Sequence, residues 1–267
     1  MWGHNPEVSM FLAVDVGNTQ STLGLFDGDG EAVHCWRMPT TSIDTSDGLR
    51  ARLHSYFAMD GFDISAVTDA GVASVVPVLT RAWRVCLTGV LGKKPLVIAP
   101  GDDCGITVDM PHPETVGADR IANAVAAVKS YGAPVIVVDF GTATNIDVVD
   151  EKGNYRGGSI SPGLMLSANA LFAKAAKLAS IPVEAPGHAM GDTTETAIQS
   201  GLVIGAAAQA EGLVSRMKDE LGIQQAKVIG TGGLARTVSK ATELFDVVDP
   251  SLTLRGIRDI WAARQGE

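Results

Sequence analysis

Two short segments place an aspartate at the end of an apolar run, directly before glycine and small polar residues. Asp15 is followed by Gly17 and Asn18, and Asp139 is followed by Gly141 and Thr142. A glycine after a strand lets the backbone approach a ligand, and neighbouring Asn or Thr side chains add donors for phosphate oxygens. An aspartate there can hold a divalent metal, which offsets the charge of phosphates. One such segment is weak evidence, but two copies at matching places predict a pair of phosphate-binding hairpins for a nucleoside triphosphate.

A third candidate is the run Gly117-Ala118-Asp119-Arg120 at the start of an expected helix. An acid in a first helical turn is also ordinary dipole complementarity. Arg120 opposes the dipole at that position and therefore indicates a specific anionic partner. The pair Asp119–Arg120 can combine a general base with an anion clamp.

Three weaker candidates have an equally good structural explanation. Residues 157–163 are dense in glycine and form either a ligand loop or a tight strand-to-helix connection. The turn at residues 231–233 can lie against adenine or ribose. Thr194 is either a ligand contact or a helix N-cap with an acidic neighbour. The histidines lack metal-ligand spacing, and the sequence has no P-loop, GxGxxG fingerprint or GxSxG elbow.

The elements that must position these residues follow from hydrophobic periodicity and turn signals. Asp15 and Asp139 lie 124 residues apart in matching patterns of apolar strand, Asp-x-Gly, second strand and acidic glycine turn. This repeat predicts two related α/β domains with a cleft between them. The expected strands are Met10–Val16, Ser21–Phe26, Ala70–Val76, Pro95–Ala99, Val135–Phe140, Asn145–Val149, Lys227–Ile229 and Asp246–Val248, and the expected helices are Gly48–Met59, Leu79–Val90 and Ala118–Tyr131.

The composition restricts the class of protein. The 267 residues are 46% hydrophobic with 30 glycines, which favours a globular protein with many tight turns over a disordered chain. A net charge of −9 disfavours nucleic-acid and membrane-surface binding. Three scattered cysteines fit a reducing compartment, and no apolar run is long enough for a membrane span. The start lacks a signal-peptide pattern, so we expect a cytoplasmic protein.

Taken together and in order, these motifs resemble the type III pantothenate kinases. The resemblance runs from about Met10 to the C-terminus. It rests on the set of motifs and not on any one of them. The matching segments are residues 14–19 (VDVGNT), 117–120 (GADR), 138–144 (VDFGTAT), 157–163 (GGSISPG) and 231–233 (TGG), with shorter echoes at 73–77, 199–201 and 252–254.

The resemblance implies two RNase H-like domains of the actin-like ATPase superfamily, at residues 10–117 and 118–267, with residues 1–9 as an extension. It implies a homodimer that phosphorylates pantothenate with ATP, in the first step of coenzyme A synthesis. A divalent metal such as Mg²⁺ and a monovalent cation, K⁺ or NH₄⁺, are the implied cofactors.

The resemblance also implies roles for individual residues. Asp119 accepts the proton of the pantothenate hydroxyl, Asp15 helps to place Mg²⁺, and Asp139 binds the monovalent cation. The implied ATP-binding residues are Asp15, Val16, Gly17, Asn18, Thr19, Gln20, Ser21, Thr22, Thr142, Gly232 and Gly233. The implied substrate-binding residues are Met110, Gly117, Ala118, Asp119, Arg120 and Thr194, the last reaching the substrate of the partner subunit.

The sequence departs from the family pattern at two positions. Met110 stands where the family usually has a substrate-contacting tyrosine, and Asn145 replaces a threonine of the second hairpin. Methionine supplies apolar area but no hydroxyl donor. Two alternatives therefore stay open: a nucleotide-binding paralogue that acts as a regulator, and a kinase of the same superfamily for another small hydroxyl substrate.

Overall fold

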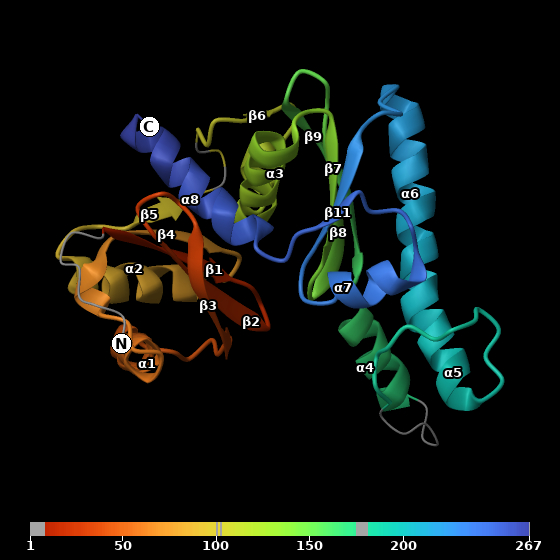
Figure 1. Ribbon diagram of the computed structural model, residues 1–267, viewed down its shortest axis with the longest axis horizontal. Helices are drawn as coiled ribbons and strands as arrows, with labels where there is room; N and C mark the ends of the chain where they lie inside the picture. Colours follow the sequence, from red (N-terminus) through yellow and green to blue (C-terminus); the bar gives the residue numbers. More distant parts are fainter. Residues whose placement is uncertain (1–8, 100, 102, 175–180, 267) are drawn as a thin grey trace. The chain divides into compact units, whose positions relative to one another are not determined.

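The computed structural model describes residues 9–99, 101, 103–174 and 181–266, and its contacts divide the chain into two compact units (Figure 1). The first unit contains the residues up to 105, residues 112–126 and the residues from 253 onward. The second contains residues 106–111 and 127–252. Each unit is built on its own β-sheet.

The first unit has a mixed five-stranded sheet in the order β3-β2-β1-β4-β5. The strand β1 pairs antiparallel with β2 and parallel with β4. The strands are β1 (Met10–Val16), β2 (Gln20–Phe26), β3 (Ala32–Pro39), β4 (Val67–Ser74) and β5 (Leu96–Ile98), and the helices are α1 (Ser46–Met59), η1 (Ile64–Ala66), α2 (Pro77–Leu91), η2 (Pro113–Thr115), the first part of α3 (Ala118–Tyr131) and α8 (Leu252–Gln265).

Both faces of this sheet are buried, which explains the nearly continuous apolar runs of β1 and β4. On one face, Leu12 and Val14 pack in a core with Leu53 of α1 and Trp83 of α2. On the other face, α8 lies so close that a Cβ at Gly71 would be 2.6 Å from the side chain of Ile257. The sheet is therefore the middle layer of three.

The second unit has a mixed six-stranded sheet in the order β11-β10-β7-β8-β9-β6. The strand β7 pairs antiparallel with β8 and parallel with β10. The strands are β6 (Thr107–Val108), β7 (Val135–Phe140), β8 (Ala143–Val149), β9 (Asn154–Pro162), β10 (Lys227–Thr231) and β11 (Val247–Val248), and the helices are α4 (Leu164–Lys174), α5 (Thr194–Gln199), η3 (Ser200–Ile204), α6 (Gly205–Leu221), α7 (Ala235–Val238) and η4 (Ser239–Ala241).

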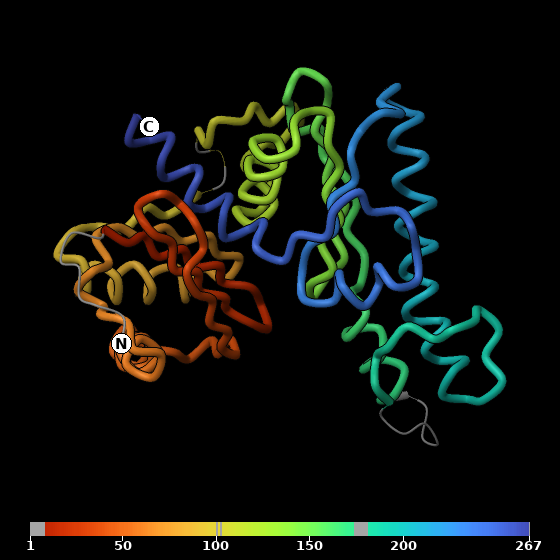
Figure 2. Tube along the Cα trace, viewed as in Figure 1, coloured from red at the N-terminus to blue at the C-terminus, as the bar shows by residue number. Residues whose placement is uncertain are grey.

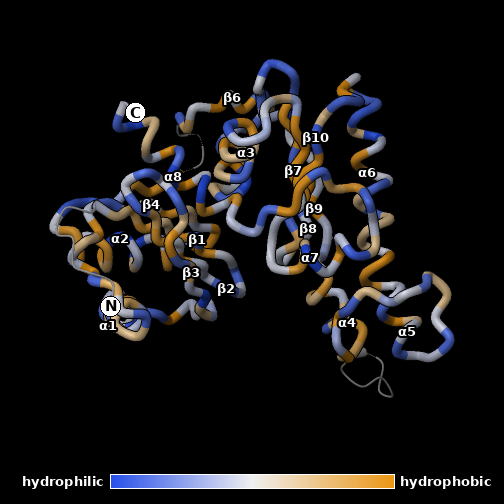
Figure 3. Tube along the Cα trace, in the orientation of Figure 1, coloured by the Kyte–Doolittle hydropathy of each residue, from blue (hydrophilic) through white to orange (hydrophobic). Residues whose placement is uncertain are grey.

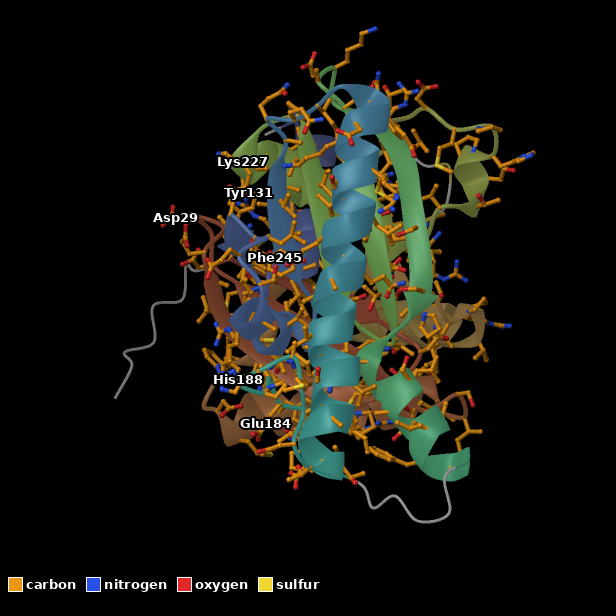
Figure 4. The ribbon with its side chains drawn as sticks, turned by 90° about the vertical axis from the view of Figure 1, so that its right-hand side faces the viewer. Asp29, Tyr131, Glu184, His188, Lys227 and Phe245 are labelled. Atoms are coloured by element: carbon orange, nitrogen blue, oxygen red, sulfur yellow. The ribbon has the colours of Figure 1, made fainter. Side chains whose placement is uncertain are left out.

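The long helix α6 covers one face of this second sheet (Figure 4). Its Ala207, Ala210 and Val214 pack against Ile136 and Val138 of β7. The hydrophobic colouring runs along β7 and β10 in Figure 3, as expected for strands inside a core. The sheet therefore buries the strand that carries Asp139.

The two sheets repeat one another in register. In the first unit Gly24 pairs with Cys35, and in the second Asp147 pairs with Gly158, each 123 residues later. A β-bulge follows Leu25 in the first sheet and Val148 in the second, at the same offset. The repeat inferred from the motifs is thus present in the strand pairing.

The expected strands and helices are present, with small shifts at their ends. Three strands were not anticipated: β3, β6 and β9. The interpretation of residues 157–163 as a ligand loop or a bare connection is wrong, because residues 157–162 lie within β9. Only Gly163 belongs to the connection, and it precedes α4.

The compact units do not follow the boundary expected between residues 117 and 118. Residues 118–126 and 253–267 belong to the first unit, because α8 and the start of α3 pack together there. A Cβ at Gly256 would be 1.9 Å from the carbonyl oxygen of Ala122. Of the expected extension at residues 1–9, residues 1–8 lie outside the described residues.

Candidate active site

The first phosphate hairpin is an open turn at the carboxyl end of β1. Asp15 is half-buried and pairs with Thr22, while Asn18, Thr19 and Gln20 are exposed between the strands. The Gly17 N–H donates to the Gln20 carbonyl oxygen at 3.1 Å, which closes the turn. Val16 and Ser21 are buried at its base, and Gly17 and Thr22 are half-buried.

The acidic helix start lies at the same edge of the first sheet. The Val75 N–H donates to the Val16 carbonyl oxygen at 3.1 Å. The Val75 Cγ1 atom is in turn 3.7 Å from where a Cβ of Gly117 would be. The connection after β4 thus joins the first hairpin to Gly117 and α3. Because both segments lie in one unit, Asp15 and Asp119 share the carboxyl edge of β1 and β4.

Asp119 is held in its own helix turn. Its Oδ1 atom accepts the Arg120 N–H at 2.9 Å. A Cβ at Gly117 would lie 2.5 Å from that oxygen, so a larger residue there would displace the Asp119 carboxylate. Burial raises the pKa of the Asp119 carboxyl, and the N–H and positive charge of Arg120 act in the opposite direction. A raised pKa makes this carboxylate a stronger base. Ala118 is buried beside it.

The turn of the second hairpin has one residue fewer between its last paired residues than the turn of the first hairpin. Phe140 pairs with Thr144, with residues 141–143 between them, and Asp139 pairs with Asn145. Thr142 is exposed, and its carbonyl oxygen accepts the Gly163 N–H at 3.1 Å. This hairpin is therefore bonded to the start of α4.

The turn after β10 packs directly on the second hairpin. Thr231 pairs with Asp139 across β10 and β7. Gly232 has a φ of +90°, and a Cβ there would lie 2.4 Å from Asp139 Oδ1. Gly233 is exposed. The structure thus brings together three of the predicted residues of the second unit: Asp139, Thr142 and Gly232.

Thr194 is the exposed first residue of α5, on an open depression of about 520 Å³. Its alternative as an N-cap is wrong by one residue, because the Thr193 side chain accepts the Thr196 N–H. Figure 2 follows the loop of residues 181–193 that leads into α5. Figure 4 shows Glu184 and His188 of that loop near the α5 end of the long helix. The depression is lined by Leu171, Thr194, Ala197, Ile198, Gly201 and Leu202.

Met110 packs over β9. It is half-buried, and its Sδ atom would lie 3.4 Å from a Cβ of Gly157, which has a φ of +101°. Next to it, the Tyr155 hydroxyl donates to buried Asp147 Oδ1 at 2.6 Å. The thioether of Met110 therefore covers this part of β9. At this sequence position the family pattern has a tyrosine.

The protein side chains near the hairpins fit a metal ion whose ligands are mostly phosphate oxygens and water. Within the described ranges, no group of three or more His, Cys, Asp or Glu side chains is arranged around a metal position. Mg²⁺ in nucleotide sites is commonly held by one or two carboxylates together with phosphates and water. Asp15, the penultimate residue of β1, carries a carboxylate of the kind that serves as such a protein ligand.

Sequence reasoning missed Thr40, and it named Gly163 only as part of residues 157–163 without its contact to the second hairpin. The Thr40 N–H donates to the Thr19 carbonyl oxygen at 3.0 Å, as Gly163 does to Thr142. The repeat itself carried the signal, because Thr40 and Gly163 are 123 residues apart, as are Thr19 and Thr142.

Comparisons with known proteins show the family of this chain. The family model described as type III pantothenate kinase matches residues 11–216. A protein of Moorella thermoacetica named type III pantothenate kinase is 42% identical over 252 residues, covering 94% of this chain and 98% of its own length.

Solved structures show the fold alone. A Baf family protein from Campylobacter jejuni has a TM-score of 0.59 at 18% identity, covering 96% of this chain and all of its own. An activator of the 2-hydroxyisocaproyl-CoA dehydratase from Clostridium difficile, solved with bound ADPNP, has a TM-score of 0.58 at 12% identity and covers 97% of this chain and 96% of its own. The fold is that of the actin-like ATPases, with two mixed sheets flanked by helices. Among the described residues, no helix is both long and apolar enough to cross a bilayer.

Proposed function

We propose that this chain, which belongs to the type III pantothenate kinase family, transfers the γ-phosphoryl group of ATP to the primary hydroxyl of pantothenate. The product is 4'-phosphopantothenate, and the reaction opens coenzyme A synthesis. The observation that carries the proposal is the placement of the first hairpin and Asp119 at one edge of one sheet.

Asp119 takes the proton of the attacking hydroxyl in this proposal. Phosphoryl transfer depends mainly on alignment and charge neutralisation, with modest help from a base. The raised pKa of Asp119 suits that task, and the adjacent Arg120 binds the anionic substrate. Gly117 and Ala118 bring the start of α3 close to the substrate.

The two hairpins bind ATP. Backbone and side-chain donors at residues 15–22 and at Thr142 contact the phosphates, and the Gly232–Gly233 turn lies against the adenosine. Convergence of both hairpins on one triphosphate stays a prediction. Asp15 would hold Mg²⁺, which neutralises phosphate charge when bound, and Asp139 would bind K⁺ or NH₄⁺.

A homodimer with a shared site is also proposed. The surface around α4 and α5 exposes several large apolar side chains, and a second copy of the chain would bury them. Thr194 on this surface would then reach the partner's substrate, with Met110 contributing apolar contact in its own subunit. The exposed side chains are Ile160, Met165, Leu166, Leu171 and Met190. A cytoplasmic location stays a prediction.

The test is product formation by the purified chain. ATP and Mg²⁺ are supplied with or without pantothenate, in KCl or NaCl, and 4'-phosphopantothenate is measured by mass spectrometry. We expect product only with pantothenate, and faster formation in KCl. Nucleotide binding without any turnover would favour the regulator, and turnover only with another small alcohol would favour a related kinase.

A further inference from the structure

The second hairpin touches backbone from two distant segments at places where only glycine fits. A Cβ at Gly163 would lie 2.4 Å from the Thr142 carbonyl oxygen and 2.5 Å from that of Gly141. These atoms belong to the backbone of the turn, so a larger residue requires the turn to move. The hydrogen bond from the Gly163 N–H to Thr142 fixes the same contact.

Gly232 makes the equivalent contact at the base of the hairpin. A Cβ there would lie 2.4 Å from Asp139 Oδ1 and 2.7 Å from the N and C atoms of Phe140. The Leu234 N–H also donates to the Phe140 carbonyl oxygen at 3.3 Å. The β10–α7 turn thus fixes both the backbone after Asp139 and the space available to its carboxylate.

The first hairpin shows that this close contact is not a requirement of the fold. Thr40 occupies the place of Gly163 and donates the same backbone hydrogen bond. Its side chain is accommodated, and its Oγ1 atom lies 2.8 Å from Ser21 Oγ. The close contact of Gly163 is therefore a particular property of the second hairpin.

We propose that Gly163 and Gly232 are positioning residues that set Thr142 and Asp139 in their binding geometry before a ligand arrives. Gly163 sets the Thr142 backbone and thereby places the Thr142 side chain for ATP, and Gly232 sets the Asp139 carboxylate for the monovalent cation. This inference rests on the proposed roles of Thr142 and Asp139. Binding groups fixed in advance lose less conformational freedom on binding, which strengthens affinity.

The main test is Gly163→Ala, because Gly163 does not have a left-handed φ and the substitution adds only the contact. We expect the ATP KM and the ATP Kd from calorimetry to rise at least about tenfold, with a smaller change in kcat, as for a lost ground-state contact. The matched control is Gly187→Ala, since Gly187 is exposed with no atom within 4 Å of the added Cβ. Unchanged ATP affinity in folded Gly163→Ala overturns the inference.

The second variant is Gly232→Ala, and the quantity measured is the thermal stabilisation by the monovalent cation. Binding to the folded state raises the melting temperature, so KCl should stabilise the unmodified chain more than NaCl does. We expect Gly232→Ala to lose this difference, and a retained difference counts against the inference. Circular dichroism checks that the variant is folded.

Amide hydrogen exchange on the unmodified chain decides the matter if either variant fails to fold. Without nucleotide, the Gly163 N–H should be protected while the amides of residues 18–20 exchange quickly. Equally fast exchange at both hairpins contradicts pre-positioning. Thr142→Ala and Asp139→Asn separate the two proposals: normal ATP affinity and cation response in these variants refute the proposed binding roles, whereas impaired binding there with a normal Gly163→Ala refutes positioning.

Discussion

The two hairpins proposed to bind phosphate share one frame but differ in what supports them. Strand pairing and the β-bulge repeat at an offset of 123 residues, whereas Asp15 and Asp139 are 124 residues apart. The one-residue difference therefore lies in the turn itself. The first turn is longer and exposed, and it is backed by Thr40 and Ser21 hydroxyls. The second is shorter and contacts two glycines.

The difference indicates a division of tasks. The first unit combines an open hairpin with Asp119, the group proposed to move a proton, at one sheet edge. The second unit offers a hairpin whose backbone is already fixed. A duplicated frame can thus keep its register while one copy specialises in chemistry and the other in ligand positioning.

The largest expected effect is a loss of turnover in the first unit that leaves ATP binding intact. Asp119→Asn should reduce kcat by about 10²- to 10⁴-fold, the usual contribution of a general base, with ATP affinity retained. Turnover assays and calorimetry measure both. A variant with nearly full turnover would show that Asp119 is not the base.

The same variant has a predicted sign for stability. Because burial raises the pKa of Asp119 in the folded state, the folded chain binds a proton more readily than the unfolded chain. The ionised Asp119 carboxylate therefore lowers the free energy of unfolding at pH values above its folded pKa. Below its unfolded pKa the carboxyl is protonated in both states, and this effect is absent. Asp119→Asn should melt higher than the unmodified chain at neutral pH, with a smaller difference in acid.

Exchanging the supports of the two hairpins tests the comparison itself. Gly163→Thr copies the first half into the second and should lower kcat/KM for ATP by about 100-fold, since small displacements of binding groups cost this much. The reverse copy, Thr40→Gly, removes the Thr40 side chain with its hydroxyl contact to Ser21 but keeps the backbone hydrogen bond to Thr19, and it should cost less than about tenfold. Equal losses in both variants would mean that the hairpins are supported alike.

A smaller effect is expected from the apolar surface of the second half. Leu166→Glu should weaken self-association at least about tenfold in sedimentation experiments, because a charge would be buried at the proposed interface. Val85→Glu on α2 is the matched control, since both side chains are 51% exposed. Identical association of the two variants would place the interface elsewhere.

The smallest effect concerns the far turns of the two repeats. Asp27 Oδ1 accepts two backbone N–H groups, and Asp150 Oδ1 does the same 123 residues later. Burial acts to raise the pKa of Asp150, but the Asn154 N–H, the Arg156 guanidinium and the Lys152 N–H outweigh it and lower that pKa.

A lowered folded pKa gives stability that is present above the unfolded pKa and lost as the pH falls through the folded pKa. Asp150→Asn should therefore cost about 0.5–1 kcal/mol at neutral pH and little in acid. Chemical denaturation at two pH values measures it, with Asp27→Asn expected to cost less because Asp27 has no arginine partner among the described residues. A larger cost at Asp27 would contradict this assignment.

The sequence predicted the parts of the structure that depend on local pattern. Strands β1 and β7, their terminal aspartates and the helix start at Ala118 follow from apolar runs and turn residues. The strand β9 was missed because its glycines resemble a loop, and its strand conformation depends on pairing with β8 and β6. The contacts of Gly163 and Gly232 were missed because they join residues far apart in sequence, which local patterns of apolar and turn residues do not report.

The C-terminal helix α8 has a practical consequence for anyone dissecting the molecule. Its Leu254 and Ile257 are buried against Gly24 and Gly71 of the sheet formed by the chain's opening strands. Proteolysis or a stop codon after residue 252 would thus remove the helix that covers one face of the first unit's sheet. To express the first unit by itself, a gene must join the last fifteen codons to the codons for residues up to 105 and 112–126.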